Sequence, residues 1–306
     1  MKKRLVALTL VAAMALGMTA CGSKSEGKIS TNDTSANGTS HPAVSAGVDW
    51  TGYDELVDSI RTEADLAKRA EMMHQAEDML MDTWCVIPLY YYNDQYMLKD
   101  YVTGVYSTVE GMKYFYNAKN TKNAGKLNIF MASEPDHIDP ALNSTVDGGC
   151  LAVNSFEGLM RYNAEGKLEP ACAESYEVSE DGLTYTFTMR DGLKWSNGDE
   201  VTANDFVYSW KKIIKNAGTY AYMLGDDGAS VKNASQLIDL GPKATDEQMN
   251  TLGVKAADDK TLVVELNNKV PYFTDLMAFP CYYPQNEKFV EKCGKNYGTK
   301  PEYTLS

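Results

Sequence analysis

The strictest alternation of hydrophobic and polar residues in this chain runs from Thr184 to Arg190. Tyr185, Phe187 and Met189 fall on one side of an extended backbone, and the threonines between them fall on the other. Glycine turn sequences bracket the run, Glu180-Asp181-Gly182 before it and Arg190-Asp191-Gly192 after it. Because side chains alternate between the two faces of a strand, the pattern predicts a strand with one buried face.

A change to helical spacing follows this strand. Thr202 has the residue type of a helix N-cap, and Asp205, three positions on, can complete a capping box. The residues after it form one apolar stripe at helical intervals, which predicts a helix with one buried face: Phe206, Val207, Trp210, Ile213 and Ile214.

A second helix and a second strand are predicted nearer the start of the chain. The helix begins after Thr62-Glu63-Ala64-Asp65 and runs from Leu66 to Trp84. The run Val86 to Tyr92, VIPLYYY, then has the composition of a strand, with Pro88 near its beginning, where a missing N–H is tolerated.

The first residues have the layout of a secretory signal. A basic start precedes an apolar run from Leu5 to Met18, which is short for a membrane span, so we expect residues 1–20 to be a signal peptide. Met18-Thr19-Ala20-Cys21 resembles a bacterial lipobox, so we expect a lipid anchor on Cys21; the alternative is an ordinary signal with an incidental cysteine. Residues 21–47, rich in Ser, Thr, Gly and Asn, are expected to be a flexible tether.

Composition and charge exclude several classes of function. The net charge of −13 argues against nucleic-acid binding, which depends on Lys and Arg to neutralise phosphates. The chain has no G-x-S-x-G, HExxH or phosphate-loop motif, so we expect that this protein is not an enzyme. No C-x-x-C pair is present, and Asp136, His137 and Asp139 precede Pro140 as turn residues would, so we expect no metal and no cofactor.

The cysteines leave one question open. If Cys21 carries the lipid, an odd number remains, and we expect buried free thiols, although an extracytoplasmic disulfide is an alternative. The five are Cys85, Cys150, Cys172, Cys281 and Cys293.

The run SEDGLTYTFTMRDGLKWSNGDEVTANDFVYSW resembles the periplasmic oligopeptide-binding proteins of ABC importers, family 5 of the solute-binding proteins. It has their strand ending F-x-x-R-D-G, then W-S-x-G, then V-T-A-x-D-F-V-Y-S; Tyr176 replaces the family's usual Trp. The resemblance implies an α/β, periplasmic-binding-protein-like fold of type II. Residues 126–306 would form its N-terminal lobe, with an inserted subdomain of sheet and helices at 149–280 and the second lobe largely absent.

A second resemblance places the family's end before its beginning. Residues 48–118, with the strand VIPLYYY, resemble the family's C-terminal segment, and a polar linker at 119–125 leads to KLNIFMASEPDHIDPAL, which resembles its first strand. A permuted gene and an assembly of displaced fragments both fit this order. The helix from Leu66 leans on the second lobe in the family, so we expect it to be loosely packed here.

The resemblance also implies a function and its residues. Tyr220 and Tyr92 fall at peptide-contacting positions, the main chain of Val146 aligns with another, and Ser144 stands where the best-studied relatives have an acidic residue. We therefore expect a monomeric, lipid-anchored protein on the outer face of the cell membrane that captures short peptides for the permease of an ABC importer. The alternatives are a rearranged or truncated remnant that binds nothing, and a surface interaction module.

Overall fold

The computed structural model describes residues 50–135 and 137–306. The predicted signal peptide at 1–20, the anchor residue Cys21, the tether at 21–47 and the turn residue Asp136 lie outside the described residues. Within them no helix is both long enough and apolar enough to cross a membrane.

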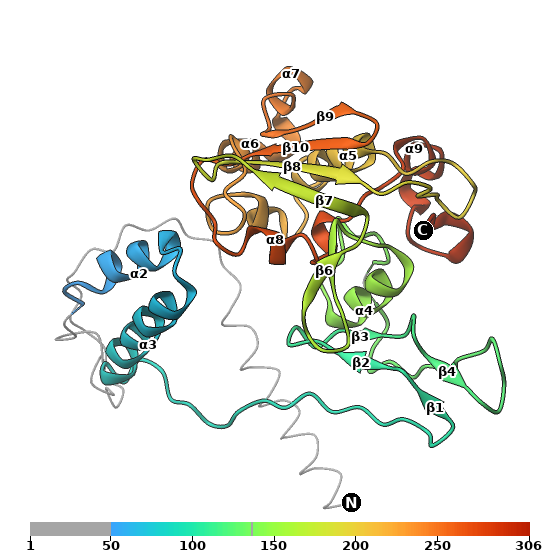
Figure 1. Ribbon diagram of the computed structural model, residues 1–306, viewed down its shortest axis with the longest axis horizontal. Coiled ribbons are helices and arrows are strands. Elements are labelled where there is room, and N and C mark those ends of the chain that lie inside the picture. The colour runs from blue at the N-terminus through green and yellow to red at the C-terminus, as the bar shows by residue number, and fades with distance from the viewer. Residues whose placement is uncertain (1–49, 136) are drawn as a thin grey trace, which may run out of the picture. The chain divides into compact units, whose positions relative to one another are not determined.

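The largest sheet in the described part of the chain is four-stranded and antiparallel, in the order β7-β8-β10-β9 (Figure 1). One of its two central strands, β8, Thr184–Met189, confirms the strand predicted from the alternating pattern. Phe187 is fully buried and Met189 is 2% exposed, while Thr188 on the opposite face is exposed. The neighbouring strands are β7, Ala173–Val178, β9, Val254–Asp258, and β10, Thr261–Glu265.

Helix α5, Ala203–Lys215, packs on this sheet and confirms the predicted capped helix. The backbone N–H of Thr202 donates to the carboxylate of Asp205 at 2.8 Å, which is one half of the capping box. Trp210 is fully buried, and its indole N–H donates to the carbonyl of Tyr282 at 3.0 Å. The apolar stripe therefore forms one hydrophobic core with the buried face of the sheet.

The carboxyl group of Asp205 predicts how stability changes with pH. Burial raises the pKa of this carboxyl group above its ordinary value of 3.8. A carboxyl whose pKa is higher when folded than when unfolded stabilises the fold below the unfolded pKa, and that contribution is lost as pH rises through the folded pKa. We expect the stability of the wild type relative to Asp205→Asn, measured by urea unfolding, to fall between pH 3.5 and pH 7. A difference that grows over this range would contradict the prediction.

The remaining elements of this part of the chain are short. Helix α4, Val146–Ser155, precedes the paired strands β5, Met160–Tyr162, and β6, Leu168–Pro170. The others are listed in chain order: η1, Ala221–Leu224; α6, Ala234–Leu240; η2, Gly241–Lys243; α7, Asp246–Met249; α8, Phe273–Leu276; η3, Pro280–Tyr282; α9, Glu287–Cys293; η4, Gly294–Asn296; and η5, Pro301–Tyr303.

The segment at 102–120 forms two small antiparallel pairs. Strand β1, Val102–Thr103, pairs with β4, Lys119–Asn120, and β2, Tyr106–Ser107, pairs with β3, Lys113–Tyr114. The β2–β3 hairpin belongs to a second hydrophobic core, whose other buried members come from residues 150–305. The side-chain amide of Asn154 in α4 accepts from the N–H of Phe115 at 2.6 Å and donates to the carbonyl of Lys113 at 2.7 Å. Residues on both sides of the predicted linker at 119–125 thus share one core.

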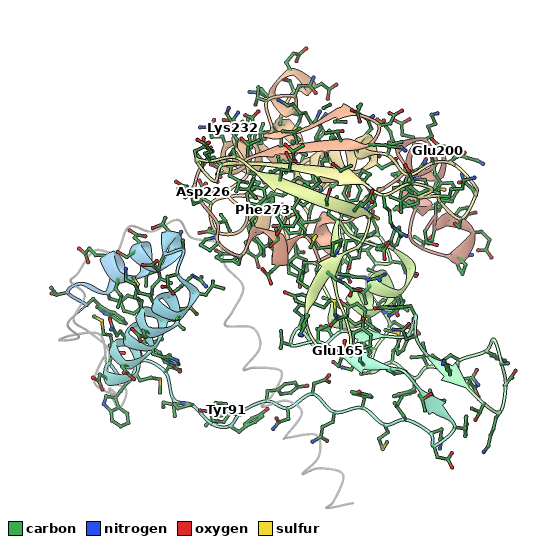
Figure 2. All side chains as sticks on the ribbon, viewed as in Figure 1. Tyr91, Glu165, Glu200, Asp226, Lys232 and Phe273 are labelled. Carbon is green, nitrogen blue, oxygen red and sulfur yellow. The ribbon has the colours of Figure 1, made fainter. Side chains whose placement is uncertain are left out.

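Two predicted strands are wrong. In the described part of the chain neither Val86–Tyr92 nor the run that begins at Lys126 pairs with another strand. Figure 1 shows the first run as an extended coil between α3 and β1, and Figure 2 shows Tyr91 on it. A strand needs a neighbouring ladder and a covering layer, and both are lacking, so Leu89 is 85% exposed and Phe130 is 95% exposed.

The helix predicted from Leu66 is confirmed as α3, Leu66–Asp82, preceded by α2, Tyr53–Thr62. The carboxylate of Asp65 caps it by accepting from the N–H groups of Ala67 and Lys68. It ends before Trp84, which has a positive φ of 58° that a helix does not contain. The expected loose packing is confirmed, since Leu66 is 64% exposed and Met73 is 48% exposed.

The five described cysteines are free thiols, as expected. Cys150, Cys172 and Cys281 are buried and Cys293 is half-buried. Cys85 is exposed, which corrects the expectation of burial for this residue; it lies just before the unpaired run Val86–Tyr92.

Candidate functional site

Two adjoining loops carry three of the four residues predicted to contact a peptide. Ser144 and Val146 lie at the start of α4, and Tyr220 lies just before η1. The loops meet at Gly218, where an added Cβ would lie 2.4 Å from the carbonyl oxygen of Ala141. Only glycine permits this close approach, so Gly218 allows the backbones of the two loops to lie in contact.

The loop before α4 presents its candidate residues outward. Ser144 is exposed, and the side chain of Val146 is 54% exposed. The amide of Asn143 holds the loop in shape, accepting from the N–H of Thr145 at 3.2 Å and donating to its carbonyl at 3.1 Å. The Thr145 hydroxyl accepts from the N–H of Gly148 at 3.1 Å and caps the helix. This surface is therefore preorganised, and Val146 is exposed on it.

Tyr220 lies at the edge of the main hydrophobic core. Its ring is half-buried and meets Phe279 edge-on, with 5.2 Å between ring centroids. Tyr222, 6.4 Å away between centroids, is 51% exposed. The two tyrosines thus form an aromatic patch with polar hydroxyls, a surface that suits apolar and hydrogen-bonding ligands.

A buried ion pair anchors the loop before α4 to helix α5. The carboxylate of Asp139, 2% exposed, accepts from the ammonium of Lys212 at 2.6 Å and from the amide of Gln285 at 2.5 Å. Burial lowers the pKa of Lys212. The carboxylate of Asp139 also accepts from the backbone N–H of Ala141 at 3.0 Å. This hydrogen bond confirms the turn predicted around Pro140.

Sequence reasoning missed the roles of Lys212 and Gln285. One signal was present for Lys212, since it lies between Trp210 and Ile213 on a helix whose apolar stripe is buried. Its partner is 73 residues away in sequence, so the pairing itself could not be predicted from local pattern.

Tyr92 is placed differently from the other three residues. It lies on the unpaired run and is 82% exposed. Two residues later, Asp94 accepts from the ammonium of Lys113 at 2.5 Å, which ties this part of the run to the β2–β3 hairpin. The turn of that hairpin lies near Val146, because a Cβ on Gly111 would be 3.8 Å from the Val146 side chain. The role of Tyr92 stays a prediction.

The described residues contain no group of three or more His, Cys, Asp and Glu side chains placed to hold a metal ion. What the site does offer is an exposed Val146, hydroxyl groups and an aromatic patch. Such groups are suited to holding a polar, extended molecule with an apolar side chain.

Comparison with known proteins shows what this chain is similar to. Residues 167–304, which include Tyr220, match the family of bacterial extracellular solute-binding proteins, family 5, middle part. The chain is 48% identical over 177 residues to the oligopeptide-binding protein OppA of Bacillus subtilis, an alignment that covers 57% of this chain and 31% of that protein.

Solved structures give the same result. The substrate-binding domain of an oligopeptide ABC transporter from Bacillus anthracis is 44% identical, with a TM-score of 0.51 over 55% of this chain and 31% of that one. OppA of Haemophilus influenzae in complex with the peptide RPPGFSPFR is 39% identical, with a TM-score of 0.52 over 56% of this chain and 33% of that one. The mixed α/β fold thus matches part of the OppA-type binding proteins.

The matched class is that of extracytoplasmic solute-binding proteins, which are not enzymes. Over about half of its length, the chain is homologous to the family 5, OppA-like oligopeptide-binding proteins, which confirms the resemblance seen in the sequence. The chain spans about a third of the length of the relatives that it matches. The matched family region begins at residue 167, so the resemblance of residues 48–118 to the family's C-terminus stays a prediction.

Proposed function

We propose that this protein captures oligopeptides outside the cytoplasm for an ABC importer, with the first lobe of a type II fold and with Cys21 as its lipid anchor. The observation that carries the proposal is the homology to oligopeptide-binding proteins together with the adjoining loops of Val146 and Tyr220. The remaining parts of the proposal, namely the monomeric state, the permease partner and the domain boundaries at 48, 118 and 126, rest on the resemblance.

The peptide would lie in an extended form past the exposed Val146 at the start of α4 and form hydrogen bonds with the main chain there. Main-chain hydrogen bonds of this kind do not depend on the peptide's side chains, so they suit varied ligands. Tyr220 would contact the peptide backbone near its amino terminus. In the family the carboxylate that pairs with the peptide's ammonium lies on the second lobe, and an ammonium that leaves water without a partner weakens binding.

Thermal-shift titration of the purified chain with mixed tri- to pentapeptides tests the proposal. A ligand that binds only the folded state stabilises it by about 2.7 kcal/mol at a concentration of 100 Kd, so the melting midpoint should rise with peptide concentration. A cooperative melt whose midpoint stays constant would favour the surface interaction module.

The Tyr220 side chain is the sharpest local test. We expect Tyr220→Ala to weaken peptide affinity about tenfold, because tyrosines at interfaces often contribute more than 1 kcal/mol. The matched control is Tyr303→Ala, which removes a partly exposed tyrosine in η5. Isothermal titration calorimetry should show the loss for Tyr220→Ala alone, and equal affinities for the two variants would count against the assigned site.

One observation favours the alternative of a remnant that binds nothing. Neither the run Val86–Tyr92 nor the run that begins at Lys126 pairs with another strand in the described part of the chain, and Leu89 and Phe130 on them are exposed. The same thermal titration decides, because a remnant would show no cooperative melt.

A further inference from the structure

A cavity of about 310 Å³ lies at the opposite end of α4 from the candidate peptide site. Tyr114 and Tyr116, which follow the β2–β3 turn, contribute to its wall, as do residues after the end of α4 and residues 190–195. Val146 and Phe156 are ten residues apart, which is about 15 Å along a helix. Ser144, Val146, Tyr220 and Tyr92 are not among the lining residues.

The inner surface of this cavity is aromatic. Tyr114, Phe156, Trp195 and Tyr283 line it, and each is at most 7% exposed. The Cys172 thiol also lines it, and burial raises its pKa, so the thiol stays neutral and adds no negative charge. The volume is at the lower end of the range of about 300–1,000 Å³ that is usual for small-molecule sites. The cavity therefore has room for one aromatic ring and a short chain.

The charged side chains that line the cavity leave an excess of positive charge. Glu157 accepts from Arg161 at 2.7 Å and from Arg190 at 2.5 Å, and Glu169 accepts from Arg161 at 2.8 Å. Of these two carboxylates only Glu157 lines the cavity, and Glu169 pairs with Arg161 from outside the lining. Lys194 adds one more positive charge, and none of the ion pairs among the described residues includes it.

Hydrogen-bond donors remain available at the same place. A guanidinium group has five N–H donors, and the Arg190 side chain uses one of them, to Glu157. The Arg190 side chain is 50% exposed, and Lys194 is exposed. Both charged groups are therefore accessible to an anion that enters from solvent. A carboxylate is the group that pairs best with such a planar fork of donors.

We propose that this cavity is a second binding site, which takes a small monocarboxylate that carries an aromatic ring. Arg190 and Lys194 hold the carboxylate, and the ring packs among Phe156, Trp195 and Tyr283. The site is separate from the proposed peptide site and does not depend on it.

Isothermal titration calorimetry of the full chain with 3-phenylpropionate tests this site. We expect saturable binding of one molecule per chain, and about tenfold weaker binding of both 2-phenylethylamine, which has the ring but the opposite charge, and butyrate, which has the charge but no ring. Equal affinity for the amine, or no saturable binding by a protein that melts cooperatively, would overturn the proposal.

Variants locate the site. Arg190→Gln and Lys194→Gln should each weaken 3-phenylpropionate binding about five- to tenfold. Lys288→Gln, the same change on an exposed lysine of α9, should leave it unchanged. Because Lys194 is exposed and outside the ion pairs, its variant should fold even if Arg190→Gln does not. Unchanged binding by Lys194→Gln would reject the site. Tyr220→Ala should not affect this ligand, so failure of the peptide site and failure of this site can be told apart.

Discussion

Replacing Asp139 with alanine is expected to lower the free energy of unfolding by about 3–5 kcal/mol, because removing one partner of a buried ion pair leaves the other charge uncompensated. The side chains of Asp139 and Lys212 are 3% and 10% exposed, and their charged atoms are 2.6 Å apart. Gln285, which also bonds to both groups, would lose one of its partners. Urea unfolding followed by circular dichroism measures the change.

A surface pair provides the control for this prediction. Glu265 on β10, with its side chain 34% exposed, accepts from Lys232 at 2.8 Å and from Lys255 at 3.3 Å, both of them more than half exposed. Glu265→Ala should cost less than about 1 kcal/mol, because solvent screens such ion pairs. Replacing both buried partners, Asp139→Leu with Lys212→Met, should recover much of the stability, because two apolar side chains leave no charge unpaired. Equal losses for Asp139→Ala and Glu265→Ala would refute the buried pair.

Removing the Phe187 ring should destabilise the fold about as much as Asp139→Ala does. We expect Phe187→Ala to lower the free energy of unfolding by about 3–5 kcal/mol, through lost burial and the cavity that remains. The ring is fully buried at the centre of β8 and lies 5.7 Å from the ring of Tyr176 and 6.3 Å from that of Phe273, measured between centroids. Several neighbours would therefore lose contacts at once.

The adjacent residue is a matched control on the same strand. Thr188 points to the opposite, exposed face, so Thr188→Ala should change the free energy of unfolding by no more than about 0.5 kcal/mol. The comparison tests the alternation on which the strand was predicted. A loss for Thr188→Ala as large as that for Phe187→Ala would mean that the strand is not half-buried as described.

The segment at 102–120 packs against residues that come after the predicted linker at 119–125. Tyr106, Met112 and Tyr114 share a core with Val153 and Phe156, and Asn154 bonds to the backbone of the β2–β3 hairpin on both of its polar atoms. These contacts thus join the segment at 102–120 to residues that follow that linker. Order along the chain matters less than proximity in the fold, which is why permuted chains can keep a core.

Local pattern by itself was enough to predict β8, α5 and the start of α3. In each case the information lies within a few residues: strict alternation for β8, an N-cap and helical spacing for α5, and the Asp65 cap for α3. In the fold, β8 pairs with neighbouring strands on both sides, and the two helices form their backbone hydrogen bonds internally. Local preference and tertiary packing therefore agree for these three elements.

Other features were decided by the tertiary structure alone. Val86–Tyr92 has the composition of a strand, yet no neighbouring strand completes its hydrogen bonds, and a strand cannot satisfy them by itself as a helix does. The pairing of Asp139 with Lys212, and the cavity beside Arg190, join residues far apart in sequence. The sequence thus determined which residues could form elements, and the contacts between distant segments determined which of them did and where charged groups meet.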